Sequence, residues 1–208
     1  MDPLDKAVLA SLYTNSLEPS VSAYERMNAR LPISQEFFDS RISQLAKIGF
    51  VEKDAPAKLT YLGRDAIRVV LVGGVFDLIH PGHIHTLKAA KEQGDVLVVV
   101  VARSSTAQKI KKGRTIYHDE ALRKELVSSL SFVDIVIIGR EGTLYDTVEY
   151  VKPDVIALGY DQAHSEKDVS ENCKKRNLNI RVVRLSTPIP GSKSSKMKED
   201  LGDSFYGI

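Results

Sequence analysis

Short apolar runs alternate with amphipathic segments over the second two thirds of the chain. The apolar runs predict five strands, at residues 69–75, 96–102, 135–139, 155–159 and 180–185. Four of these runs are rich in Val and Ile and apolar on both faces, as strands buried in a parallel sheet are. The segments between them predict helices at residues 82–93, 117–130, 143–151 and 166–176. This alternation predicts a doubly wound, Rossmann-like α/β domain with a five-stranded parallel sheet over residues 67–208.

A different pattern occupies residues 1–66. Apolar residues recur at helical spacing in three stretches, at residues 4–12, 21–31 and 34–48, and the second and third stop at Pro32 and Gly49. Two short strands, at residues 50–53 and 58–61, are predicted around a turn at 54–56. Three helices followed by a two-stranded ribbon predict a winged helix-turn-helix domain. The phrase LAKIGFVEKDAPAKLTYLGRDAI is similar to the recognition helix and wing of that family.

Composition excludes several classes of protein. Of the 208 residues, 43% are hydrophobic and 27% charged, which is typical of a soluble globular protein, and the formal net charge of +2 requires neither nucleic acid nor an anionic membrane as partner. The single cysteine, Cys173, forms no internal disulfide and has no Cys or His neighbour at metal-ligand spacing. The longest apolar run is too short to span a bilayer, and the first residues do not resemble a signal peptide. We expect a cytoplasmic protein without a membrane anchor.

The stretch GGVFDLIHPGH, residues 73–83, carries the densest group of chemically useful side chains. It follows the first predicted strand of the α/β domain and begins the next predicted helix. In open α/β sheets, ligands bind outside the carboxyl ends of the strands, and a helix N-terminus offers N–H groups to an anion. The spacing fits neither the dinucleotide-binding GxGxxG pattern nor the P-loop. His80 precedes the helix and His83 lies in its first turn, so both imidazoles are placed to point at one anion.

Two other interpretations of the histidines compete with phosphate binding. Two histidines three positions apart are able to share a metal ion, but Asp77 is the one acid nearby and the segment supplies no third ligand by spacing. The second alternative is that both rings only cap and pack the helix. The Pro-Gly pair between them, directly after a glycine-rich strand end, favours phosphate binding, and we predict no metal site in the protein itself.

From Arg68 to about Leu201 the chain resembles the HxGH nucleotidyltransferases that are built like cytidylyltransferases. GGVFDLIHPGH is similar to their GTFDxxHxGH signature, SFVDIVIIG to one of their strands, and KSSKM to the start of their last helix. The resemblance implies an enzyme that transfers a nucleotidyl group from a nucleoside triphosphate to a phosphate-bearing acceptor and releases pyrophosphate. An acceptor phosphate is ionised at neutral pH, so the reaction needs positioned cationic and N–H donors rather than a general base.

The resemblance also implies a set of site residues. His80, His83, Lys111, Lys112 and Arg123 are the implied catalytic residues, the two lysines in a mobile basic loop and Arg123 facing the phosphates from the following helix. The implied nucleotide-binding residues are Gly73, Gly74, Val75, Phe76, Asp77, His80, His83, Lys109, Asp134, Gly159, Tyr160, Asp161, Gln162, Ser194 and Ser195. From the residues alone, the lysines are equally a solvated charge run, Arg123 a surface residue paired with Asp119 or Glu120, and the serines an ordinary helix cap. Mg²⁺ is the implied cofactor, because a cation makes a triphosphate a better electrophile.

Two departures from the family pattern bear on the substrate. Val75 replaces the hydroxyl residue of GTFD, and residues 187–191 lack the arginine found there in glycerol-3-phosphate cytidylyltransferases, with Arg184 a candidate substitute. VVVARSS and LGYDQ look like the archaeal type of FAD synthase, which uses ATP and FMN and usually bears cysteines near its C-terminus. Because that cysteine signal is missing, we predict a CTP:glycerol-3-phosphate cytidylyltransferase that makes CDP-glycerol, with ATP:FMN adenylyltransferase as the alternative.

The charge of residues 1–66 argues against a third alternative, a DNA-binding regulator that senses a nucleotide. These residues hold eight Lys and Arg against nine Asp and Glu, a net charge of −1, and DNA binding requires a cationic face. In the predicted recognition helix, Glu36 and Asp39 offset the basic residues. We therefore predict a dimerisation or interdomain role and a homodimer, with Phe37 and Phe38 as candidate anchors of an interface.

Overall fold

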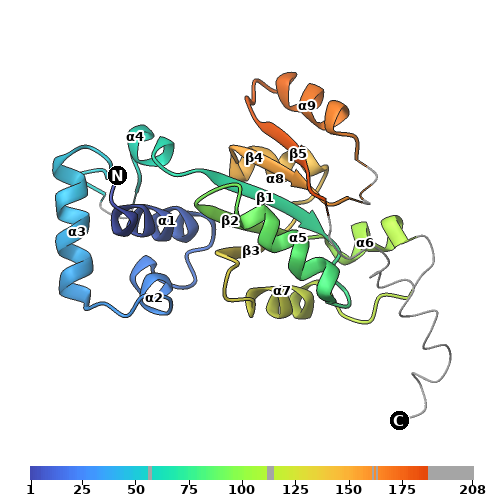
Figure 1. The fold of residues 1–208 in the computed structure, drawn as a ribbon, viewed down its shortest axis with the longest axis horizontal. Helices are drawn as coiled ribbons and strands as arrows, with labels where there is room; N and C mark the ends of the chain where they lie inside the picture. The colour runs from blue at the N-terminus through green and yellow to red at the C-terminus, as the bar shows by residue number, and fades with distance from the viewer. Residues whose placement is uncertain (56–57, 112–114, 161, 163, 187–208) are drawn as a thin grey trace, which may run out of the picture. The chain divides into compact units, whose positions relative to one another are not determined.

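The computed structural model describes residues 1–55, 58–111, 115–160, 162 and 164–186. These residues divide into two compact units (Figure 1). The first comprises Met1–Val69 together with Gly94–Val96, and the second begins at Val70 and takes up the remainder. No helix in the described part of the chain is both long and apolar enough to cross a membrane.

The first unit is built from helices α1 (Pro3–Leu17), α2 (Ala23–Asn28), α3 (Gln35–Lys47) and α4 (Tyr61–Asp65). Each begins at a side chain that accepts a hydrogen bond from a free N–H group of the first turn, which is the usual start signal of a helix. Helices α1 to α3 bury one apolar core, which consists of Val8, Leu9, Leu12, Met27, Phe38 and Leu45. The three predicted helices are therefore present, although α2 is shorter than predicted.

The structure contains part of the predicted two-stranded wing. Val51 and Leu59 form an isolated antiparallel bridge, flanked by hydrogen bonds from Glu52 N to the Lys58 carbonyl oxygen and from Thr60 N to the Phe50 carbonyl oxygen. The second strand predicted at 58–61 is too long, because α4 begins at Tyr61. The Thr60 hydroxyl accepts a hydrogen bond from the Gly63 N–H group and donates one to the Gly49 carbonyl oxygen. A Cβ atom at Gly63 would lie 1.9 Å from the Phe50 carbonyl oxygen. Glycine at 63 and a cap at 60 thus favour a helical turn packed against residue 50.

The second unit contains a five-stranded sheet with the strand order β3-β2-β1-β4-β5. The strands are β1 (Val69–Gly74), β2 (Val96–Val101), β3 (Ile135–Ile138), β4 (Val155–Leu158) and β5 (Arg181–Arg184). They pair in parallel, for example Val70 with Val155 and Val98 with Ile135. β2 and β4 are buried along their whole length, as their two-sided apolar runs predicted. The predicted α/β fold with a five-stranded parallel sheet is confirmed.

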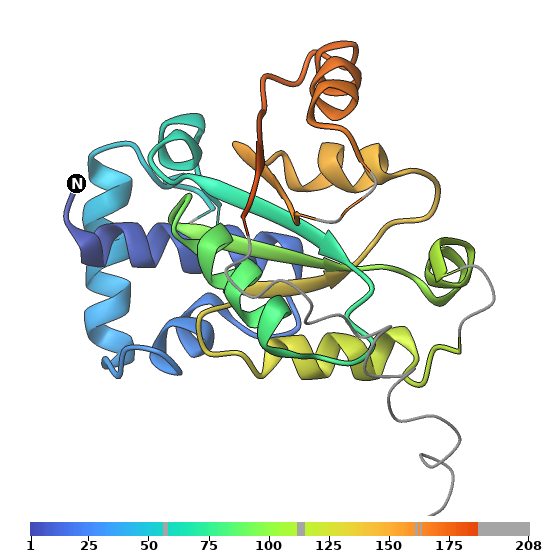
Figure 2. The same cartoon turned by 45° about the vertical axis from the view of Figure 1, so that its right-hand side comes forward.

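Five helices accompany the sheet: α5 (Pro81–Lys91), α6 (Ser104–Lys111), α7 (Glu120–Ser128), α8 (Leu144–Val151) and α9 (Glu166–Lys174). Helices α5 and α7 cover one face, where Leu87, Ala90 and Val127 pack against alternate residues of β1 and β2 (Figure 2).

Helix α6 corrects the sequence interpretation, which placed Lys109 and Lys111 in a loop. The Ser104 N–H and hydroxyl groups bind the Glu120 carboxylate at the start of this helix, and Ala107 is fully buried. That hydrogen bond lowers the pKa of Glu120 below its usual value.

Candidate active site

The strand order contains a topological switch point, which lies between β1 and β4. From β1 the chain passes through α5 to β2 on one side, whereas β4 lies on the other side of β1. In open parallel sheets, ligands bind at the carboxyl ends of the two strands at such a switch point. Here those ends are Gly73–Gly74 and Gly159, so the GGVFDLIHPGH turn lies directly at the expected crevice.

The structure brings the two histidines of the turn together. His80 is the N-cap residue of α5, and its ring stacks on the ring of His83 with the centroids 3.9 Å apart. The ring centroids of Phe76 and His83 lie 5.3 Å apart, in an edge-on arrangement. His80 makes no side-chain cap hydrogen bond, so helix capping does not explain why a histidine stands there. The pair sits at a helix N-terminus, where ring N–H groups and the helix dipole favour an anion.

The same turn contains one residue with a strained backbone conformation. Phe76 has a φ of 52°, a left-handed conformation that a bulky residue rarely adopts. Its ring is almost fully buried and lies over Gly74, where a Cβ atom would come within 2.7 Å of the ring. Strained residues persist where the surrounding structure holds them, and they cluster at functional sites. Gly74 therefore gives Phe76 room to support His83.

The Asp77 carboxylate accepts hydrogen bonds from the protein backbone. Its side chain is 4% exposed, and Oδ1 accepts hydrogen bonds from the N–H groups of Tyr117 and His118, both at 3.0 Å. His118 Nδ1 lies 3.0 Å from the Asp77 carbonyl oxygen. Asp77 thus fastens residues 117–118 to the turn that carries His80 and His83, and its part in nucleotide binding stays a prediction.

Arg123 does not occupy the surface position that was the alternative interpretation of this residue. The side chain is fully buried, and Nε donates to the His118 carbonyl oxygen. Nη1 donates to the carbonyl oxygens of Val75 at 2.7 Å and Ala102 at 2.8 Å. Burial lowers the pKa of Arg123 from its usual value, against the opposing effect of three nearby carboxylates. These bonds tie the ends of β1 and β2 to the start of α7, so the structure supports a clamp on the site. Nη2 is buried and has no hydrogen-bond partner among the described residues, so the phosphate contact stays a prediction.

The loop after β4 is closed by its own side chains. Gln162 Nε2 donates to the Gly73 carbonyl oxygen at 2.6 Å, and Gln162 Oε1 accepts from the Gly159 N–H group at 3.1 Å. Tyr160 is about one third exposed. The Gln162 amide joins β4 to β1 across the switch point, and the contact of this loop with the nucleotide stays a prediction. Arg184, the candidate substitute for the missing family arginine, donates to carbonyl oxygens of the same loop.

The other predicted residues fall into two groups. Asp134 lies before β3, at the amino-terminal edge of the sheet, where Oδ2 accepts from Leu97 N and Lys91 Nζ at 2.6 Å each. Because the site is at the carboxyl edge, the predicted role of Asp134 in holding the base is not supported. Lys109 is exposed on α6 and Lys111 is the last residue of that helix. Asp161, Lys112, Ser194 and Ser195 lie outside the described residues.

Fold and site together define a nucleotide-binding α/β protein of the Rossmann-like class. Residues 71–200 match the cytidylyltransferase-like family, and the chain belongs to this family. It is a nucleotidyltransferase. It is similar to two proteins named FAD synthase. The one from Thermoplasma acidophilum is 47% identical over 141 residues, covering 65% of this chain and 98% of the relative. The one from Pyrococcus horikoshii is 45% identical over 147 residues, covering 69% and 99%.

A solved structure supports the same class. The lipopolysaccharide core biosynthesis protein from Thermoplasma volcanium aligns with a TM-score of 0.56 and 45% identity over 59% of this chain and 99% of that one. The FAD synthase relatives overturn our prediction of a CTP:glycerol-3-phosphate cytidylyltransferase. The error arose because we weighed a missing C-terminal cysteine above the VVVARSS and LGYDQ segments.

Proposed function

We propose that the protein transfers AMP from ATP to FMN, forming FAD and pyrophosphate. The similarity to the FAD synthases at 45–47% identity, over nearly their whole length, carries this proposal. In the transfer, a phosphate oxygen of FMN attacks the α-phosphorus of ATP, and the bond to the leaving pyrophosphate breaks. The FMN phosphate is ionised at neutral pH, so no base is needed. His80 and His83 would act as donors to the triphosphate, since their stacked rings stand at the N-terminus of α5 at the switch point.

We propose that magnesium binds to the protein together with ATP. Within the described residues, no group of three or more His, Cys, Asp or Glu is placed to hold a metal ion, and the Asp77 carboxylate binds backbone N–H groups. This part of the chain therefore does not fit a metal site made of protein ligands alone. Mg²⁺ characteristically keeps its waters and binds substrate phosphates, which is the arrangement we propose.

The substrate pair is tested by measuring pyrophosphate release from ATP or CTP, each combined with FMN or glycerol-3-phosphate, in the presence of magnesium. We expect release with ATP and FMN, and FAD as the product identified by chromatography. The two CTP reactions and the reaction of ATP with glycerol-3-phosphate should stay at the background of a reaction without acceptor. Activity confined to another pair would refute the proposed substrates while leaving the nucleotidyltransferase class intact.

We also propose that residues 1–66 form a winged-helix-like domain that mediates homodimerisation. The three capped helices and the Val51–Leu59 bridge support the winged-helix proposal. Of the two candidate anchors, Phe38 is buried in the core of the unit, whereas Phe37 is 43% exposed on α3 and available to a partner. The net negative charge of the segment remains unfavourable for DNA. A cytoplasmic location stays a prediction.

Light scattering of the full chain tests this second proposal. We expect a dimer mass for the natural sequence and a monomer mass for Phe37→Ser, because removing an exposed aromatic anchor weakens an interface without opening the core. Circular dichroism should show the same helix content in both proteins. A monomeric natural protein would refute the dimer, and salt-sensitive binding of duplex DNA at micromolar concentration would favour a regulator instead.

A further inference from the structure

Arg184, the last residue of β5, gathers one loop around its guanidinium group. It stands opposite Leu158, the last residue of β4, so its side chain reaches the segment that follows β4. Nη1 donates to the carbonyl oxygens of Gly159 at 2.9 Å and Gln162 at 3.0 Å, and Nη2 donates to that of His164. Nε donates to the Glu166 carboxylate in the first turn of α9, at 3.2 Å.

The geometry of these bonds requires an arginine. The acceptors come from residues 159 to 166 and lie on different sides of one planar group. A guanidinium offers five N–H donors in a fixed fork, whereas a lysine offers one compact ammonium group. Because three carbonyl oxygens of this loop bind one guanidinium group, their positions relative to one another are fixed by the same side chain.

Gln162 fastens the opposite side of the same loop. Its amide spans from Gly159 N to the carbonyl oxygen of Gly73, the residue that opens the histidine turn. The loop is thus fixed to β5 by Arg184 and to β1 by Gln162. Since β1 and β4 border the switch point, Gly159 and Gln162 stand at the edge of the sheet where ligands of such sheets bind.

We propose that Arg184 and Gln162 are positioning residues that hold Gly159, Gln162 and His164 in the positions that bind the nucleoside triphosphate. Neither side chain needs to touch the nucleotide, because the Gln162 amide and the Arg184 guanidinium bind the protein's own backbone and Glu166. Their effect is to hold these residues in place beforehand, so that binding does not have to order them. This inference deepens the proposed function and rests on it only in taking a nucleoside triphosphate as the ligand.

Isothermal titration of the full chain with magnesium-ATP and with magnesium-CTP, without acceptor, tests the proposal. For Arg184→Ala we expect the Kd of the tighter-binding nucleotide to rise about tenfold, because binding must then order residues that Arg184 no longer holds, with the stoichiometry unchanged. If the role of Arg184 were purely structural, partial unfolding would lower the stoichiometry and leave the Kd of the folded fraction unchanged. An unchanged Kd in Arg184→Ala, at any stoichiometry, overturns the proposal.

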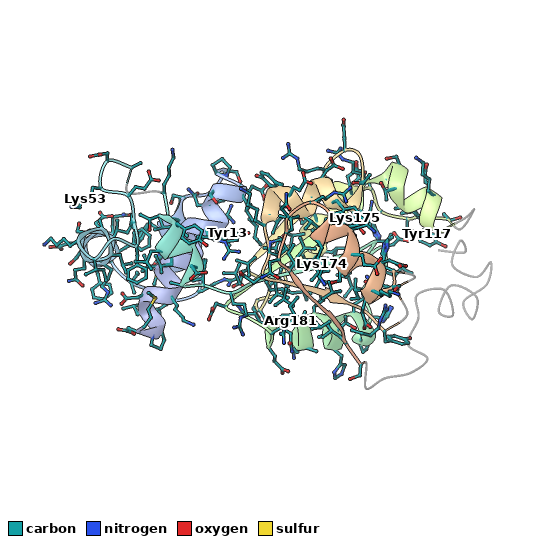
Figure 3. All side chains as sticks on the ribbon, turned by 90° about the horizontal axis from the view of Figure 1, so that it is seen from above. Tyr13, Lys53, Tyr117, Lys174, Lys175 and Arg181 are labelled. Carbon is teal, nitrogen blue, oxygen red and sulfur yellow. The ribbon has the colours of Figure 1, made fainter. Side chains whose placement is uncertain are left out.

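Matched variants complete the test. Arg181→Ala is the control, because Arg181 begins the same strand, is exposed, and donates to Gln93 well away from Tyr117 and the carboxyl ends of the strands (Figure 3). Its Kd should equal that of the natural protein. Should Arg184→Ala not fold, Gln162→Ala carries the test with the same expected rise. In the double variant, the effects should be less than additive because both act on one loop, and full additivity would show two independent roles. Because the titrations contain no acceptor, the measured Kd values can be interpreted even if the protein does not use FMN.

Discussion

Replacing His83 with alanine is expected to lower turnover at least about a hundredfold, the order found when one transition-state donor is removed. His83 lies in the first turn of α5, with its ring stacked on His80 and supported by Phe76. Alanine removes the ring N–H group but keeps the helix, because it is the best helix former. Steady-state pyrophosphate release with ATP and FMN measures the change, and melting temperature checks that the fold is retained.

His85→Ala is the control for this variant. His85 stands two residues further along the same helix and is exposed, so it shares the helix but not the stacked pair. We expect its turnover to match that of the natural protein. If His83→Ala retained turnover within a factor of about two, the role of His83 as a donor to the triphosphate would be rejected.

Replacing Arg123 with methionine is expected to destabilise the fold by about 3 kcal/mol or more, because three carbonyl oxygens lose their donor in a buried place. Those oxygens belong to Val75, Ala102 and His118, at the ends of β1 and β2 and just before α7. Methionine keeps much of the buried volume, so the loss reports hydrogen bonding more than a cavity. Urea unfolding followed by circular dichroism measures the change in the free energy of unfolding.

Lys174→Met is the comparison for Arg123→Met, because Lys174 is an exposed cation on α9 (Figure 3). We expect its free energy of unfolding to change by less than about 0.5 kcal/mol, as for most surface positions. The outcome also separates the two roles considered for Arg123. A phosphate-binding arginine would give a variant of natural stability and low turnover, whereas a clamp gives an unstable variant. Natural stability in Arg123→Met would therefore contradict the clamp.

Helix α6 shows where local pattern was insufficient. Its sequence, SSTAQKIK, is polar and carries a run of lysines downstream, which we interpreted as a basic loop. The helix depends on Glu120, sixteen positions away, to bind the N–H and hydroxyl groups of Ser104. A capping partner at that distance leaves no signal within the window over which helical periodicity is judged.

Asp134 is a different kind of error, because the sequence contained the information needed to avoid it. The residue stands immediately before a strand that was correctly predicted, and in a parallel sheet every strand begins at the same edge. Ligands bind at the opposite edge. A residue before β3 is therefore placed away from the crevice by topology alone. The family resemblance led us to set that argument aside.

The sequence by itself determined the five strands, the α/β class and the place of the histidine turn at the end of β1. A strand that is buried on both faces needs apolar side chains at consecutive positions, so a short stretch of sequence is enough to recognise it. Tertiary structure alone decided what Asp77, Arg123 and Gln162 do. Their partners are backbone N–H and carbonyl groups from segments distant in sequence. Every residue carries such backbone groups, apart from proline's missing N–H, so no residue type marks the partner, and only the folded chain shows which one a side chain reaches.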